Sequence, residues 1–169
     1  MKRHEIYMQQ ALDQARETLE QGEFPVGCVM EYQGRVVATG KRRNSSGRPN
    51  ELDHAEMIAL RQLLDTDETV DMGRVTVYCT LEPCLMCFST LLVNGIRNIV
   101  YSYEDAMGGG TALDLARLTP LYQEMDVVVT GGVMRSQSLE LFRIFFATPG
   151  NDYLRGTLLA EYTLDQLVE

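Results

Sequence analysis

The sequence predicts an α/β fold in three layers, with a mixed five-stranded sheet between helices on both faces. Helical and strand patterns alternate along the 169 residues. A glycine turn joins the first two strands as antiparallel neighbours, whereas the last two strands are separated by enough residues for a crossover between parallel strands. The length fits one domain with a substantial core, and no internal repeat is present.

The first third of the chain predicts a helix followed by a hairpin. Residues 5–20 place apolar side chains at helical spacing: Ile6, Ala11, Leu12, Ala15 and Leu19. After a stop at 21–22, residues 25–30 and 35–38 flank a turn at Gln33 and Gly34, which predicts two antiparallel strands. A polar loop at 41–53 then precedes a helical pattern at 54–64.

The remainder of the chain alternates strands and helices. β-branched and aromatic residues predict strands at 75–79, 99–103 and 127–130. Pro83 marks the start of a helix and Asn94-Gly95 its end. Further helices are expected at 112–118, along the apolar face formed by Leu139, Phe142, Phe145 and Phe146, and at 153–168.

The charge balance is acidic. The chain has 24 Asp and Glu against 15 Lys and Arg, which gives a net charge of −9. An acidic surface repels nucleic-acid phosphates and anionic membranes, although a basic stretch at 41–43 with Arg48 runs against this balance. No apolar run approaches the roughly 18 to 20 residues of a membrane span, and no signal-like segment follows Met1. We therefore expect a cytoplasmic protein with no membrane partner.

Histidine and cysteine side chains lie at two predicted helix starts. His54 opens one helix, and Cys84 and Cys87 open another. Residues three apart on a helix share a face, so the two sulfurs can grip one ion, and the helix dipole favours their thiolate form. His54 supplies a nitrogen as the third ligand. The other thiols, Cys28 and Cys79, fall in predicted strands and are expected to be buried.

One histidine and two cysteines leave the fourth position of a tetrahedral zinc ion open, as in catalytic sites. Zinc would lower the pKa of a water at this position, and Glu56 would take its proton and deliver it to a ring nitrogen and a departing amine. A C-x-x-C pair is also typical of structural zinc sites and thioredoxin-like dithiols. However, no second pair closes a structural site, and a dithiol would leave the sequence HAE at 54–56 unexplained.

Three segments carry a family resemblance: EFPVG at 23–27, HAE at 54–56 and TLEPCLMC at 80–87. They resemble the cytidine and deoxycytidylate deaminase superfamily, whose signature is H-x-E with P-C-x-x-C. Within it the chain is similar to the branch of tRNA-specific adenosine deaminases, guanine deaminases and cytosine deaminases, over about residues 23–146.

This resemblance implies a cytidine-deaminase-like fold, with a zinc-dependent deaminase domain at 1–150 and a C-terminal helical extension of the same domain at 151–169. It implies one zinc ion per chain on His54, Cys84 and Cys87, with proton transfer by Glu56. It also implies a homodimer in which helices beside the zinc site meet.

The same resemblance suggests substrate contacts. Asn44 resembles the family asparagine that binds the base, although its spacing to His54 is one residue shorter than in several relatives. Pro25 and Val26 would line the base pocket, and Glu82 and Pro83 would lie beside the substrate. Alternatively, Asn44 is a turn residue and Glu82 caps the helix.

The choice of substrate stays open in the sequence, because cytosine, adenine and guanine all carry a suitable amine. Residues 105–111 depart from the loop expected in bacterial tRNA deaminases, and the last segment at 153–169 is acidic. Both favour a free nucleobase, a nucleoside or a related small heterocycle as the substrate. Adenosine in a tRNA anticodon is the alternative, which the basic stretch supports unless it is a solvated loop. A non-catalytic zinc-stabilised binding protein is the third hypothesis, which the presence of Glu56 disfavours.

Overall fold

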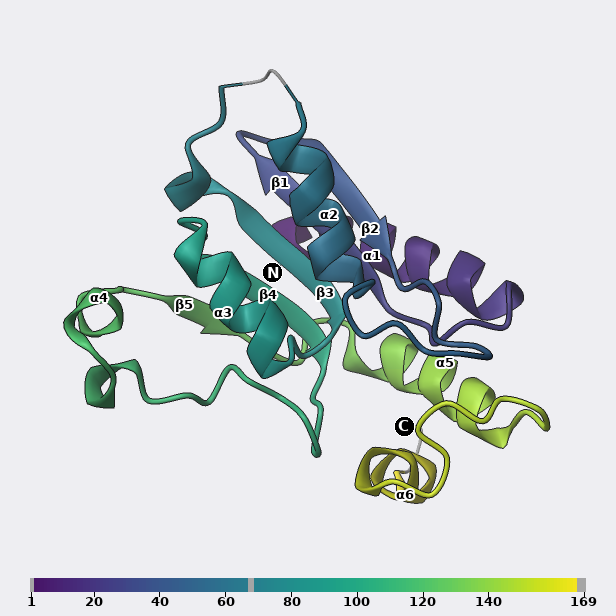
Figure 1. The fold of residues 1–169 in the computed structure, drawn as a ribbon. Coiled ribbons are helices and arrows are strands. Elements are labelled where there is room, and N and C mark those ends of the chain that lie inside the picture. The colour runs from purple at the N-terminus through teal and green to yellow at the C-terminus, as the bar shows by residue number, and fades with distance from the viewer. Residues whose placement is uncertain (1, 67–68, 167–169) are drawn as a thin grey trace.

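The computed structural model describes residues 2–66 and 69–166, and it confirms the predicted α/β arrangement (Figure 1). Five strands form one sheet in the order β2-β1-β3-β4-β5. They are β1 (Gly27–Tyr32), β2 (Arg35–Lys41), β3 (Thr76–Leu81), β4 (Asn98–Tyr103) and β5 (Val128–Thr130). β1 pairs antiparallel with β2 and β3, whereas β3, β4 and β5 run parallel, so the sheet is mixed as predicted.

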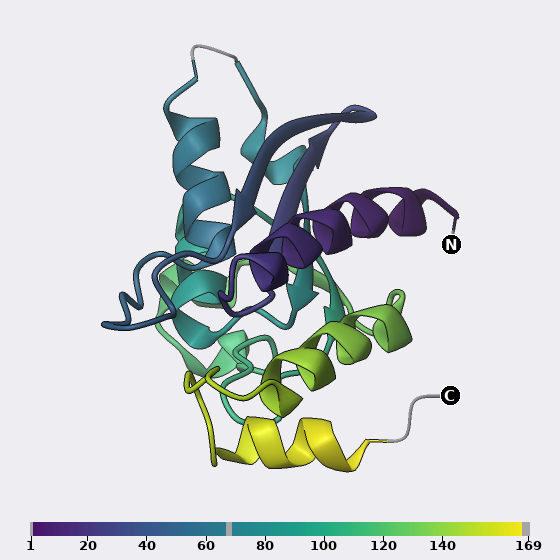
Figure 2. The same ribbon diagram turned by 90° about the vertical axis from the view of Figure 1, so that its right-hand side faces the viewer.

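Helices cover both faces of this sheet. The described α-helices are α1 (Lys2–Glu20), α2 (Ala55–Leu64), α3 (Leu85–Val93), α4 (Pro120–Gln123), α5 (Arg135–Ala147) and α6 (Leu158–Asp165). α1 and α5 lie side by side on one face, and α2 and α3 lie on the other (Figures 1 and 2). α6 packs on α5. None of the described helices is both long and apolar enough to cross a membrane.

The β1–β2 hairpin turns where the sequence predicted. Gln33 and Gly34 both have positive φ, 52° and 86°, as a two-residue type I′ turn requires. The two strands keep a regular register until Met30, where it shifts by one residue. This hairpin places the beginning of β1 and the end of β2 side by side, at one edge of the candidate functional site.

Cys28 and Cys79 form a cross-strand pair in the middle of the sheet. They are register partners on β1 and β3, both are fully buried, and their sulfurs lie 3.9 Å apart. Burial raises the pKa of both thiols. The expectation that these two cysteines are core residues is therefore confirmed.

Two predicted helices differ from the structure. Residues 112–118 form only a 3-10 turn (Leu115–Arg117), and α4 then starts at Pro120, a residue suited to a first helical position. The last helix starts at Leu158 and not at 153, because Leu154 and Gly156 adopt positive φ, which interrupts a helix. Residues 167–168 of that predicted helix lie outside the described residues.

Candidate functional site

Two helix N-caps supply candidate metal ligands. His54 is the N-cap of α2 and Cys84 is the N-cap of α3, both with extended backbone, and Cys87 lies in the first turn of α3. N-cap side chains commonly accept a hydrogen bond from their own helix. Neither His54 nor Cys84 does so. Their side chains are therefore available to each other across the gap between the two helices.

The spacing of these groups fits a zinc ion. His54 Nδ1 lies 3.6 Å from the sulfur of Cys84 and 3.5 Å from that of Cys87, and the three ligand atoms lie within 4.8 Å of one another. Tetrahedral bonds of about 2.3 Å to sulfur and about 2.0 Å to nitrogen would separate the two ligand atoms by about 3.5 Å. The donor set and its dimensions therefore match the zinc that the sequence predicts, and Nδ1 is the His54 nitrogen that faces the two sulfurs.

The two cysteines differ in charge. Hydrogen bonds from the Cys87 thiol and from the His54 ring lower the pKa of Cys84 to about 4. The neighbouring Cys84 sulfur and burial raise the pKa of Cys87. Cys84 therefore carries the negative charge of the pair at neutral pH, in the form a metal ion requires.

The Glu56 carboxyl lies in the wall of the same site. It belongs to the first turn of α2 and is only 4% exposed. Burial raises its pKa above the usual value of 4.5. Burial thus shifts the pKa of this carboxyl toward the range in which a general acid–base group works.

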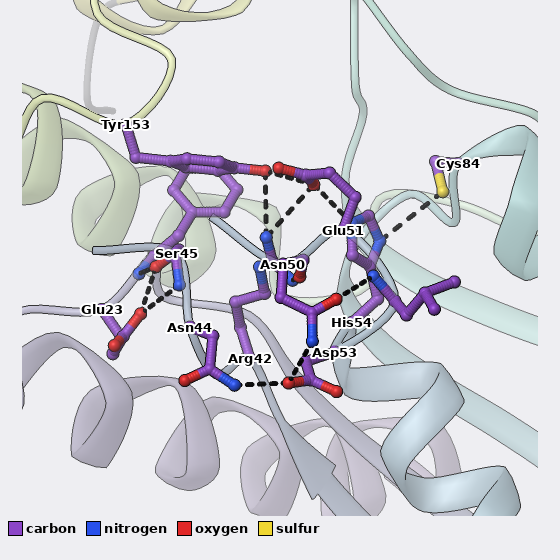
Figure 3. A network of polar contacts seen from close by, with 12 residues as sticks. Glu23, Arg42, Asn44, Ser45, Asn50, Glu51, Asp53, His54, Cys84 and Tyr153 are labelled. Carbon is purple, nitrogen blue, oxygen red and sulfur yellow. Dashed lines mark hydrogen bonds and ion pairs between the residues drawn. The ribbon is translucent and has the colours of Figure 1, made fainter. Parts of the chain in front are cut away.

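The second ring nitrogen of His54 joins a polar cluster that the sequence analysis missed (Figure 3). His54 Nε2 lies 3.2 Å from an oxygen of Glu51. The same oxygen accepts hydrogen bonds from Arg42 at 3.1 Å and from the Tyr153 hydroxyl at 2.9 Å. We name Arg42, Glu51 and Tyr153 the clasp, because they join the loop after β2 to the chain beyond α5.

A cavity of about 250 Å³ lies beside these groups. Sites for drug-sized ligands span about 300–1,000 Å³, so this cavity suits a ligand of the size of a nucleobase. Its walls combine candidate site residues with apolar side chains, and they are formed by Phe24, Val26, Arg42, Glu51, His54, Ala55, Glu56, Leu81, Glu82, Cys84, Asp105, Met107, Gly108, Tyr153, Leu154 and Leu159.

The predicted substrate contacts divide into two groups. Val26 and Glu82 line the cavity. Pro25 and Pro83 are buried beside them but are not among its lining residues. Asn44 is exposed outside the cavity, where its amide donates to Asp53. Asn44 also has a positive φ of 54°, so the structure supports the turn alternative for this residue.

Glu82 fixes the loop that closes another side of the cavity. Its carboxylate accepts hydrogen bonds from the backbone of Asp105 at 3.2 Å and of Thr111 at 3.3 Å, so it does not cap the helix. Gly110 packs so closely on the start of α3 that an added Cβ would lie 2.6 Å from the Leu85 Cα. The glycines of this loop therefore let it reach the helix that carries Cys84 and Cys87.

Two of the four basic residues at 41–43 and 48 are paired with carboxylates within the protein. Lys41 pairs with Glu17 at 3.0 Å, and Arg42 is buried against Glu51. Arg43 and Arg48 remain exposed. The loop therefore presents less positive charge than its sequence suggests.

The C-terminal part of the chain also contributes to the site. Tyr153, Leu154 and Leu159 line the cavity, and the Tyr153 ring meets that of Phe24 at 5.2 Å between centroids. No local pattern signalled these contacts, because they depend on how α5 returns the chain to the site. Phe24 did lie within the motif at 23–27.

Comparisons with known proteins agree with this geometry. Residues 1–103 match the family model described as the cytidine and deoxycytidylate deaminase zinc-binding region. The tRNA-specific adenosine deaminase of Bacillus subtilis (strain 168) is 28% identical over 148 residues, which cover 86% of this chain and 90% of that one. The tRNA-specific adenosine deaminase 2 of Danio rerio is 30% identical over 150 residues, covering 84% and 70%.

A solved structure shares the fold as well. It comes from a study of A-to-I editing by tRNA:A34 deaminases at the wobble position of transfer RNA. The match has a TM-score of 0.65 and 28% identity, and it covers 80% of this chain and 97% of that chain. Since the family model spans more than half of the sequence, the chain belongs to the cytidine and deoxycytidylate deaminase superfamily and is a zinc-dependent hydrolase acting on C–N bonds.

Proposed function

We propose that this enzyme deaminates an unphosphorylated nucleobase or nucleoside, with His54, Cys84 and Cys87 as zinc ligands and Glu56 as the proton carrier. The observation that carries the proposal is the position of Glu56: its buried carboxyl lines the same base-sized cavity as His54 and Cys84. Val26 and Glu82 border the substrate in this arrangement.

In the reaction, water adds to the ring carbon that bears the amine, the C–N bond breaks, and ammonia leaves as a carbonyl forms. Bound zinc supplies a Lewis acid that lowers the pKa of water toward neutrality. Glu56 takes a proton from the water, passes it to the ring nitrogen, and carries the next proton to the departing amine. The apolar walls formed by Phe24 and Leu81 hold the flat ring and exclude bulk water.

The charges of the cavity support a substrate without phosphate. Arg42 is the single Lys or Arg among the described lining residues, and Glu51 already pairs with it. Four carboxyl groups line the same cavity, those of Glu51, Glu56, Glu82 and Asp105. Such a lining repels an anion.

Adenosine in a tRNA anticodon is the second candidate. The curated relatives that act on tRNA favour it, since they match most of this chain. Arg43 and Arg48 lie in the same loop as the lining residues Arg42 and Glu51. Both are exposed and can contact phosphates outside the cavity. The ion pairs of Lys41 and Arg42 and the small volume of the cavity favour the small substrate instead.

A substrate panel tests the proposal. Ammonia release is measured from cytosine, adenine and guanine, from their ribonucleosides and 5′-monophosphates, and from an anticodon stem-loop. We expect turnover of one base or its nucleoside, and a loss of about 100-fold or more in Glu56→Ala with zinc content unchanged. Turnover of the stem-loop alone would establish the second candidate. No turnover of any compound by the zinc-loaded protein would favour the non-catalytic zinc-stabilised binding protein.

The quaternary structure and the domain boundaries complete the proposal. We assign residues 1–150 to the deaminase domain and 151–169 to its C-terminal extension, because Tyr153, Leu154 and Leu159 contribute to both cavity and core.

A homodimer accords with the apolar side chains that α3 exposes beside the site, Leu85 at 53% and Val93 at 60%.

A further inference from the structure

Arg42 is a buried cation in the cavity wall for which the proposed reaction has no use. It directly follows β2, and its backbone N–H donates to the carbonyl of Val26, another lining residue, at 2.9 Å. The residue is only 3% exposed. The end of the β1–β2 hairpin therefore sets the position of its backbone.

The two terminal nitrogens of the Arg42 guanidinium are hydrogen-bonded within the protein, whereas Nε is not. Nη1 donates to the carbonyl of Asn50 at 2.7 Å, and Nη2 donates to Glu51 at 3.1 Å and to the Tyr153 hydroxyl at 3.3 Å. The Tyr153 ring also lies against the guanidinium, 5.3 Å from centroid to Cζ. Within residues 2–66 and 69–166, the buried Nε has no hydrogen-bond partner.

An unpaired buried donor on a side chain that lines a ligand-sized cavity indicates a missing acceptor, because buried N–H groups are nearly always paired. Glu51 compensates the charge of Arg42, and Glu56, Glu82 and Asp105 add negative charge to the same lining. The expected acceptor is therefore uncharged. Ring nitrogens and carbonyl oxygens of a heterocycle are acceptors of this kind.

We propose that Arg42 determines substrate specificity by donating its Nε hydrogen to a ring nitrogen or carbonyl oxygen of the heterocycle, while Glu51 and Tyr153 hold the guanidinium in place. This inference rests on the proposed function. It assigns to Arg42 the contact that the resemblance assigned to Asn44, which lies exposed two residues later. The clasp thereby connects substrate recognition to the C-terminal part of the chain.

Arg42→Lys tests the contact, because it keeps the charge and removes the Nε donor. The matched control is Arg43→Lys, whose side chain is exposed and does not line the cavity. Each variant is assayed on the bases and nucleosides of the panel and on isosteres in which one acceptor is replaced, a ring nitrogen by C–H or a carbonyl oxygen by hydrogen. Zinc content and the midpoint of thermal unfolding are measured alongside.

We expect Arg42→Lys to lower kcat/KM about tenfold or more on the parent compound, as for loss of a hydrogen bond to a charged group. The isostere that lacks the acceptor of the Nε hydrogen cannot make this hydrogen bond with either protein. For that isostere, Arg42→Lys should change kcat/KM by less than about twofold. Equal losses on the parent and on every isostere would mean that Arg42 is only structural, and this would overturn the inference. Unchanged kcat/KM on all compounds would overturn it as well.

A binding measurement separates this inference from the proposed function. Affinities of the same compounds for the zinc-loaded wild type and both variants are determined by titration calorimetry, which needs no turnover. If Arg42→Lys selectively lowers the affinity for the parent compound, and the wild type deaminates no compound, the contact would be supported and the proposed reaction rejected. Failure of every compound to bind the wild type would reject the contact.

Discussion

His54 and Glu51 form a carboxylate–histidine pair behind the metal-binding groups. His54 Nε2 lies 3.2 Å from the carboxylate of Glu51 (Figure 3). The other ring nitrogen, Nδ1, faces the sulfurs of Cys84 and Cys87. Such a pair fixes the tautomer and the orientation of the ring and raises its basicity toward a metal.

Glu51→Ala should therefore weaken zinc binding. Loss of an outer partner of a metal-binding histidine typically reduces metal affinity by about 10- to 100-fold. Competition with a chromophoric chelator measures the affinity. Glu17→Ala is the control, since Glu17 pairs with Lys41 on the surface. Equal zinc affinity of wild type and Glu51→Ala would contradict the role of Glu51.

Cys84→Ala should lose zinc, whereas Cys28→Ala should keep it. Cys84 offers its sulfur to the group formed with His54 and Cys87, while Cys28 lies within the sheet and contacts Cys79. Elemental analysis should find about one ion per chain in wild type and in Cys28→Ala. Full zinc occupancy in Cys84→Ala would refute the ligand assignment.

Gly110→Ala should destabilise the protein by about 1–3 kcal/mol, because the added methyl group would lie 2.6 Å from the backbone of Leu85. Displacement of the start of α3 should also weaken zinc binding. At Gly73 the nearest atom to an added Cβ is 3.4 Å away, so Gly73→Ala is the matched control. Denaturant unfolding of the two variants measures the difference, and equal stabilities would show that the loop can shift.

The contribution of ionised Glu23 to the free energy of unfolding should be lost in acid. Burial alone would raise its pKa, but hydrogen bonds from Ser45 and Ser46 outweigh burial and lower it below 4.5. A lowered pKa stabilises the fold above pH 4.5, and this contribution is lost as the pH falls through the folded-state pKa.

Unfolding midpoints across pH test this linkage. Glu23→Gln should be less stable than wild type at pH 7, and the difference should shrink below pH 4.5. Glu20→Gln, at the exposed end of α1, is the control. A difference that stays constant between pH 7 and pH 3 would exclude the Ser45 and Ser46 hydrogen bonds as its cause.

Light scattering should find a mass twice the 19.1 kDa of one chain. Val93→Glu places a charge on the exposed apolar face of α3 and should yield monomers. Ile6→Glu changes an equally exposed apolar residue on α1 and should leave the dimer intact. Dimers that persist in Val93→Glu would place the interface elsewhere.

Local patterns predicted much of this fold. The hairpin followed from the turn at 33–34, and the end of α3 followed from Gly95, which has a φ of 91°. The grouping of His54 with Cys84 and Cys87 followed from their residue types and places at two helix starts. Each of these predictions used sequence patterns that are only a few residues long.

Contacts between distant segments could not be predicted in the same way. Tyr153 reaches Glu51 across 102 positions of sequence, and it does so only because α5 crosses the molecule. Family resemblance named Asn44 as the base contact, but the turn at that residue points its side chain to Asp53. Arg42 is buried against Glu51 and Tyr153, so its place in the cavity wall became visible only in three dimensions.

The two N-cap residues have a consequence for folding itself. His54 and Cys84 belong to different helices, so a single ion held by both acts as a removable crosslink between segments 30 residues apart. Metal-binding free energy then adds to folding free energy. The fraction of folded enzyme should consequently follow the concentration of free zinc, and a chelator should lower the unfolding temperature without touching a covalent bond.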